Sequence, residues 1–258
     1  MITRQVDGSW VLIRQIDHAT HCGEVARAWR KGPFGDAPIS DALLKAAASH
    51  DLGWTEVDGR PELDAERNPR NFTNIDEVRH AEFYSGAVRE IAKTDPGAAY
   101  LVSLHASGLY SRRYAWAGLK PVDWTKIGPH GKQLLEGERH YRSELSSMIA
   151  DDEVEFESAW RSYMLLETFD YLSLLTCFGL ESTGCSPVPT HPGQWEALGV
   201  RRLGPWAVEL DPFPFTGRSL ELEVDAVRIE PGFETVEELR RAYEAAPRYR
   251  QATEYRAA

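Results

Sequence analysis

Cysteine is scarce in this sequence. Only Cys22, Cys177 and Cys185 occur among 258 residues. An odd number without a paired spacing does not fit a disulfide framework or a zinc ribbon. Cys22 and Cys177 lie within apolar helical patterns, so we expect them to be small core residues. No residue pattern typical of a catalytic cysteine surrounds any of the three.

Long apolar runs are also missing. No uninterrupted stretch reaches the roughly 18 residues that a membrane helix needs. The first residues, Met-Ile-Thr-Arg-Gln-Val-Asp-Gly, lack the apolar core of a signal peptide. We therefore predict a cytoplasmic protein without a membrane partner.

Basic residues are outnumbered, with 29 Lys and Arg against 40 Asp and Glu and a formal net charge of −11. This balance opposes non-specific binding to phosphate backbones, so we expect no nucleic-acid partner. The phosphate-binding loop, the dinucleotide glycine fingerprint, the Gly-Xaa-Ser-Xaa-Gly elbow and His-Glu-Xaa-Xaa-His are all absent. The sequence thus implies no nucleotide, nicotinamide or flavin cofactor and favours a small-molecule substrate.

Helical periodicity dominates the first two thirds of the chain. Residues 16–180 show apolar stripes at helical spacing, which predict a core of six to seven helices. Residues 181–205 are rich in Gly, Pro, Ser and Thr and predict a connector. Strands are expected at residues 206–210 and 220–229, and a last helix after the Thr235–Glu238 capping box. We predict a mainly α protein with a small antiparallel sheet from the C-terminal strands, which residues 9–15 could join.

The expected organisation is a single domain over residues 1–258. Residues 16–180 would form the helical core. Residues 181–258 would form the connector, a β-hairpin and a C-terminal helix that packs on the core. No feature of the sequence predicts an oligomeric state.

The dipeptide His50-Asp51 ends an alanine-rich predicted helix just before Gly53. Three other segments place a histidine or a carboxylate on an apolar helical face. Such groups cost free energy when buried unless they are paired or bound to metal, so several of them on several helices suggest one shared site. The residues in these segments are His18 and His21, His105, and Glu167 with Asp170.

Mixed imidazole and carboxylate ligands suit a divalent metal ion such as Zn, Fe, Mn, Ni or Co. A metal held this way lowers the pKa of water and provides a nucleophile. Two simpler interpretations remain open: hydrogen-bonded core histidines, and a salt bridge between Asp170 and an arginine. Arg112, about two turns after His105, would bind an anionic substrate or merely neutralise nearby acids.

A long polar stretch at residues 54–73 follows the His50-Asp51 pair directly. Loops of this length in a compact domain are usually functional or mobile. We expect this stretch to cover the site, and we predict that its Trp54 and Asp58 contribute to substrate binding.

Six motifs in chain order carry a resemblance to a known family. They are Gln15-Ile-Asp17-His18-Ala19, Ala-Ser-His50-Asp51-Leu-Gly53-Trp54 with Asp58, Pro69-Arg-Asn-Phe72, Ser103-Leu-His105, Glu167-Thr-Phe-Asp170 and Pro212-Phe-Pro-Phe215. With them the chain resembles, over nearly its whole length, the uncharacterised bacterial family numbered 3891 among the domains of unknown function. That resemblance implies no activity.

The helical part is more distantly similar to the HD-domain superfamily of metal-dependent phosphohydrolases. Residue by residue, His50 and Asp51 match the consecutive pair of that superfamily, and Asp170 matches its late aspartate. Either His18 or His21 matches its first histidine, and we favour His18. His105 matches an additional histidine that some members have. After the pair the chain has Leu52-Gly53 where the superfamily often has Gly-Lys, which removes a phosphate-handling lysine.

The resemblance implies a metal-dependent hydrolase. His18, His50, Asp51 and Asp170 would hold the metal, and a small phosphorylated or otherwise anionic substrate would be hydrolysed by metal-activated water. Asp51 and His105 would be catalytic, His105 by orienting the substrate or by acting as acid or base. The alternatives are a helical module that binds or senses a ligand without turnover, and a purely structural hydrogen-bond network.

Overall fold

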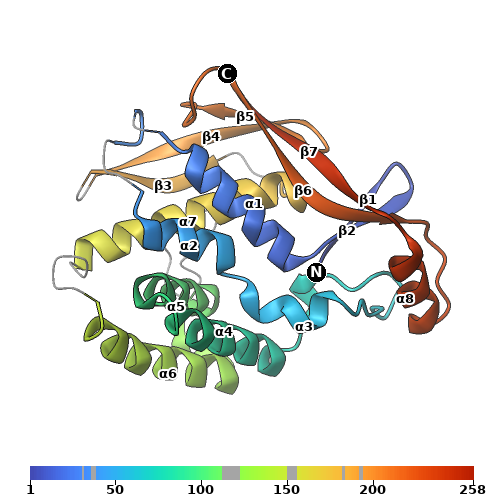
Figure 1. The fold of residues 1–258 in the computed structure, drawn as a ribbon, viewed down its shortest axis with the longest axis horizontal. Coiled ribbons are helices and arrows are strands. Elements are labelled where there is room, and N and C mark those ends of the chain that lie inside the picture. The colour runs from blue at the N-terminus through green and yellow to red at the C-terminus, as the bar shows by residue number, and fades with distance from the viewer. Residues whose placement is uncertain (31, 36–38, 112–122, 150–155, 182–183, 192–193) are drawn as a thin grey trace.

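A layer of helices lies against a curved β-sheet in the computed structural model of the chain (Figure 1). The structure describes residues 1–30, 32–35, 39–111, 123–149, 156–181, 184–191 and 194–258. The longer helices are α1 (Gln15–Ala28), α2 (Asp41–Ser49), α4 (Glu77–Ala92), α5 (Pro96–Ser111), α6 (Pro129–Ser146), α7 (Phe156–Cys177) and α8 (Val236–Ala245). Short helical turns are η1 (Leu52–Trp54), α3 (Thr55–Asp58), η2 (Phe72–Asn74) and η3 (Trp124–Lys126).

Helix α7 is the centre of the molecule. Every residue from Tyr163 to Cys177 is buried, which is the pattern of a helix enclosed on all sides. It packs against α1, α2 and α5 and also against strands of the sheet. A polar side chain on any face of this part of α7 therefore needs a partner inside the protein.

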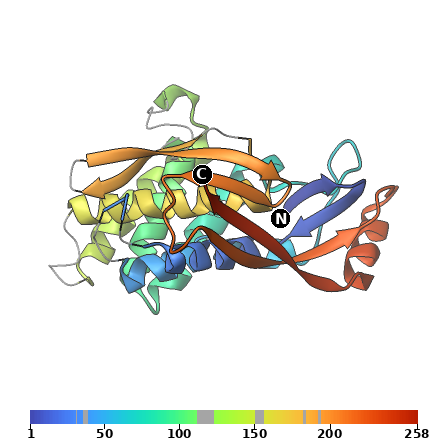
Figure 2. The same ribbon diagram turned by 90° about the horizontal axis from the view of Figure 1, so that it is seen from above.

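The sheet has seven strands in the order β1-β2-β6-β7-β5-β4-β3. They are β1 (Ile2–Val6), β2 (Ser9–Ile13), β3 (Gly184–His191), β4 (Gln194–Gly204), β5 (Ala207–Asp211), β6 (Ser219–Ile229) and β7 (Arg248–Ala257). The β5–β7 pair is parallel and the other pairs are antiparallel, so the sheet is mixed. It curves over α1 and α7 (Figures 1 and 2).

The predicted mainly α, all-helical core with a small antiparallel sheet is therefore wrong. Within residues 181–205, interpreted as a connector, residues 184–191 form β3 and residues 194–204 form β4. Prolines misled this interpretation, because β3 is an edge strand, where proline is tolerated, and its pairing with β4 has register shifts. The last strand, β7, follows Pro247 and carries four charged residues, so it lacks the apolar alternation of a recognisable strand.

Helices α2 and α8 begin with a side-chain cap. Ser40 caps α2 by accepting a hydrogen bond from the backbone N–H of Leu43. Thr235 and Glu238 form the expected capping box of α8. Among the described residues, none of the helices combines the length and the apolar character required to span a bilayer.

The main hydrophobic core fills the space between α1, α2, α5, α7 and the inner face of the sheet. Trp29 is at its centre, with ring contacts to Phe34, Phe169 and Phe215 at centroid distances of 5.3, 5.2 and 6.0 Å. Phe215 belongs to the turn-rich segment between β5 and β6. This packing fixes α1 against α7, the two helices that carry His18 and Asp170.

Gly53 is the point where the segment after His50-Asp51 meets α4. A Cβ at this position would meet the carbonyl oxygen of Phe83 and would lie 2.6 Å from its carbonyl carbon. Backbone atoms cannot move aside as a flexible side chain can. We therefore expect Gly53→Ala to lower the free energy of unfolding by about 1–3 kcal/mol, as measured by urea denaturation.

Gly59→Ala is the matched control, because a Cβ there meets nothing within 4 Å. It should change the free energy of unfolding by less than about 1 kcal/mol. Equal losses in the two variants would contradict the close approach of Gly53 to α4.

Candidate metal centre

Six polar side chains from four helical segments come together in the interior of the protein. Each is at most 2% exposed. They are His18 on α1, His50 and Asp51 at the end of α2, His105 on α5, and Glu167 and Asp170 on α7. We refer to these six side chains as the buried cluster.

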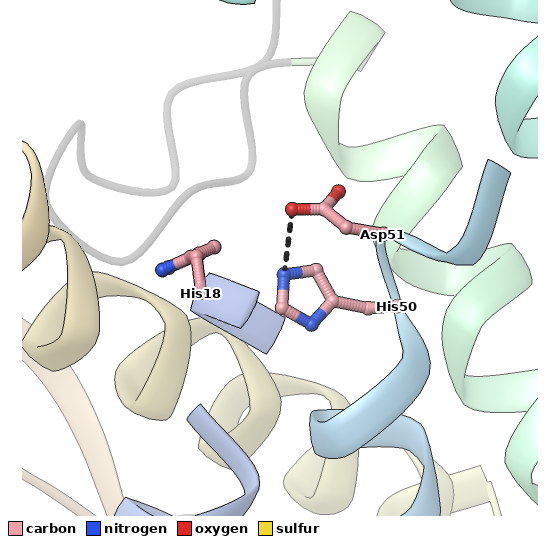
Figure 3. A group of neighbouring side chains, drawn as sticks. All are labelled: His18, His50 and Asp51. Atoms are coloured by element: carbon pink, nitrogen blue, oxygen red, sulfur yellow. Dashed lines mark ion pairs between the residues drawn. The ribbon is translucent and has the colours of Figure 1, made fainter. Parts of the chain in front are cut away.

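Asp170 lies between two imidazoles. Nε2–H of His18 donates to Oδ1 of Asp170 at 2.8 Å, and Nε2 of His50 lies 3.7 Å from the same oxygen. Nε2 of His50 also lies 3.4 Å from Oδ2 of Asp51, the ion pair drawn in Figure 3. At these distances His50 Nε2 has no hydrogen-bond partner among the described residues.

Two overlapping sets of side chains have the spacing of metal ligands. His18, His50 and Asp51 form one set, and His50, His105 and Asp170 form the other. Within each set the ligand atoms lie within 4.8 Å of one another. These buried groups could hold a metal ion. The four residues predicted as ligands thus lie together, while their role as ligands stays a prediction.

The end of α2 determines how His50 and Asp51 present their side chains. His50 keeps helical dihedral angles, whereas Asp51 leaves the helix at φ −99° and ψ 18°. Nδ1 of His50 lies 2.9 Å from the carbonyl oxygen of Ala47. A carbonyl only accepts, so Nδ1 carries the proton, and in the neutral ring Nε2 keeps its lone pair toward the carboxylates. That is the tautomer a metal ligand requires.

Hydrogen bonds to helix α7 and strand β7 separate the roles of His18 and His21. Ser173 Oγ lies 2.8 Å from Nδ1 of His18 and 2.8 Å from Nδ1 of His21. Nε2 of His21 bonds Thr253 Oγ1 on β7 at 2.9 Å. His18 therefore faces Asp170, whereas His21 lies behind Ser173. Burial lowers the pKa of His21 to about 4, so its ring is neutral near pH 7.

Electrostatics in the buried cluster favour ion pairs. Burial opposes the charge of Asp170, but the hydrogen bond from His18 and the nearby imidazole of His50 outweigh burial and hold its pKa well below the usual range. Burial likewise opposes protonation of His50, yet Asp51 and Asp170 raise its pKa well above the usual value. The pKa of His18 is raised through Asp170 in the same way, against the effect of burial. One divalent cation would replace the two imidazolium protons without changing the net charge.

His105 and Glu167 form a second buried pair. Nδ1–H of His105 donates to Oε1 of Glu167 at 2.6 Å, and the ring of His105 lies 4.9 Å from that of His50 between centroids. Burial raises the pKa of Glu167 to about 7. The hydrogen bond to Glu167 fixes the orientation of the His105 ring beside that of His50.

Sequence reasoning missed two side chains that support the cluster. The hydroxyl of Tyr84 on α4 donates to Oδ1 of Asp51 at 2.8 Å, and Ser173 orients His18. Both lie on apolar helical stripes and look like ordinary core positions. The sequence contained an indication only for Ser173, which follows Asp170 by three residues and so lies on the same face of α7.

Two of the predicted substrate-binding residues, Trp54 and Asp58, lie outside the buried cluster. Trp54 is buried, and its indole packs against Phe83 at 5.3 Å between ring centroids. Asp58 pairs with the amino group of Met1 at 2.9 Å and accepts a hydrogen bond from the backbone N–H of Ile16 at 3.3 Å. Arg112 falls outside the described residues.

A comparison with known families matches residues 1–231 to the family described as "Protein of unknown function (DUF3891)". The chain belongs to the DUF3891 family. The match includes all six residues of the buried cluster and ends before α8 and β7. No curated protein and no solved structure matches this DUF3891 chain. The similarity to HD-domain phosphohydrolases thus gains no support from relatives.

Substitution of each histidine separates the two candidates for the first ligand. His18→Gln removes the imidazole beside Asp170 and should reduce bound metal below about a tenth of an equivalent, measured by elemental analysis after metal titration. His21→Gln should keep the metal of the unsubstituted protein and lower only its stability, by about 1–3 kcal/mol, because two hydrogen bonds are disturbed. Loss of metal in His21→Gln alone would reverse the assignment.

The low pKa of His21 predicts a pH dependence of stability. Its folded pKa of about 4 lies below the ordinary 6.5, so between these values the unfolded chain binds more protons. Stability falls as the pH falls from 6.5 to 4. The stability advantage over His21→Gln should shrink across this window by up to about 3 kcal/mol, measured by denaturant titration at equal metal loading. A constant advantage would contradict it.

Proposed function

We propose that this DUF3891 protein is a metal-dependent hydrolase of a small phosphorylated or otherwise anionic substrate. The observation that carries the proposal is the convergence of His18, His50, Asp51 and Asp170 in one buried cluster. Three elements distant in sequence supply these groups. Their carboxylates and imidazoles are ligands for divalent first-row metals, with Zn, Fe, Mn, Ni and Co as candidates.

In this proposal the side chains have distinct tasks. His18, His50, Asp51 and Asp170 would hold the metal, whose Lewis acidity would lower the pKa of water and so provide a nucleophile. Tyr84 orients Asp51 through its hydrogen bond. His105, held by Glu167, orients the substrate or moves a proton. The preference for a phosphorylated substrate rests on the resemblance of His50-Asp51 and Asp170 to the HD-domain pattern.

The burial of the cluster favours a second candidate, a module that binds or senses a ligand without turnover. Each of the six side chains is at most 2% exposed. A buried metal that no substrate reaches would act as a structural or sensing element and would contribute its binding free energy to folding.

Metal analysis and a substrate panel test the proposal. Protein purified without chelator should hold about one equivalent of a divalent metal, whereas Asp170→Asn should hold less than about a tenth. Asp225 on β6, whose side chain is 40% exposed, provides a matched control, because Asp225→Asn removes the same charge outside the cluster. The proposed hydrolase should release phosphate from members of a phosphoester panel, and Asp170→Asn should not.

Three outcomes contradict parts of this proposal. Metal-free protein with no uptake on titration would contradict the metal centre. Bound metal with no turnover across the panel would contradict the hydrolase and favour the second candidate. Equal loss of metal in Asp225→Asn would show that the effect is not local.

A further inference from the structure

A second feature of the molecule is a surface pocket beside α3. Three arginines, Arg60, Arg70 and Arg79, line it together with a single carboxylate, Glu62. No member of the buried cluster is among the described residues that line the pocket. The pocket is therefore a feature separate from the proposed metal centre.

The ion pairs in the pocket leave positive charge uncompensated. Glu62 lies 3.0 Å from Arg70 and 3.5 Å from Arg79, so one carboxylate serves two guanidinium groups. Arg60 is exposed, and the salt bridges of the described residues include none for it. In a chain with a net charge of −11, this is a local excess of positive charge. Such a concavity attracts anions.

The remaining lining of the pocket is largely apolar. Trp54, Val57, Phe72 and Ile75 contribute to it. Trp54 is only 2% exposed, so it forms part of the wall of the pocket and has little contact with solvent. An apolar lining with a few convergent charged groups is the usual composition of a small-molecule site.

We propose that this pocket binds a phosphate monoester with a small apolar or aromatic body. The dianionic phosphate matches the charge that Glu62 leaves uncompensated on three arginines. Guanidinium groups pair with phosphate oxygens in a bidentate geometry that lysine does not offer. The body of the ligand would lie against the apolar lining. The net charge of −11, which disfavours binding of long nucleic acids, does not oppose a single phosphate group in a pocket lined by arginines.

The probe for this proposal is phenyl phosphate, titrated calorimetrically into the purified chain at constant ionic strength. The variant Arg60→Gln/Arg79→Gln removes two of the three positive charges. Its dissociation constant should rise at least about tenfold, since hydrogen bonds to charged groups contribute on this scale. Arg27→Gln is the matched control on the far end of α1, where Arg27 is exposed, and it should change binding less than about twofold.

The single variant Arg60→Gln is a second test in case the double variant misfolds, because the exposed Arg60 forms no ion pair with any other residue that the structure describes. It should weaken binding in the same direction with an unchanged melting temperature. An unchanged metal content in both variants would show that ligand binding in the pocket is independent of the buried cluster. Failure of the hydrolase proposal would then not contradict the pocket proposal.

Several results would overturn the proposal. One is that phenyl phosphate does not bind at concentrations up to about 10 mM, because a dissociation constant above this value is too weak for a specific site. Another is equal binding in the double variant and the unsubstituted protein, which would place the ligand elsewhere, for instance on the metal. Inorganic phosphate binding as tightly as phenyl phosphate would remove the role of the apolar lining. Tighter binding of benzoate would contradict the preference for a dianion, and tighter binding of a single-stranded oligonucleotide would indicate a nucleic-acid surface.

Discussion

The compensation of two buried carboxylates is the constraint on which the centre of this protein depends. Asp51 and Asp170 are almost inaccessible to water, and an isolated buried carboxylate would be too costly to remain ionised. Imidazoles from α1 and α2 provide the compensation. Because the partners come from different helices, α1, α2 and α7 can reach low free energy only in an arrangement that brings these groups together. Protons or a divalent metal satisfy the same requirement.

The supporting hydrogen bonds extend this constraint to the sheet. Ser173 connects His18 to His21, and His21 bonds Thr253 on β7. Strand β7 is therefore connected to His18 through His21 and Ser173, although the family match ends at residue 231, before this strand begins. A β7 strand that pairs with β6 and β5 holds Thr253 in place. The sheet is thus part of what orients the cluster and not an appendage to a helical core.

Sequence patterns predicted the members of the cluster better than the fold. Histidines and carboxylates on apolar helical stripes are conspicuous, because burial of each demands a partner, and this identified His18, His50, Asp51 and Asp170 as neighbours. His18 was favoured over His21 as the first ligand; the structure places His18 beside Asp170 and His21 against Ser173, and the ligand role of His18 stays a prediction. Strands β3 and β7 were not predicted, because the prolines of β3 and the charged residues of β7 obscure the apolar alternation that identifies a strand. Tyr84 and Ser173 escaped because a hydroxyl in a core stripe carries no signal of its own.

One short segment serves both the buried cluster and the arginine pocket. Asp51 enters the cluster, Trp54 lines the pocket three residues later, and Arg60 stands at its edge. Gly53 lies between them and packs directly on the backbone of Phe83, so the segment cannot shift there without disturbing α4. The positions of the two sites are thereby fixed relative to each other. Gly53 is thus a packing contact with α4, and the positive charge of this region lies on the arginines that follow it in the sequence.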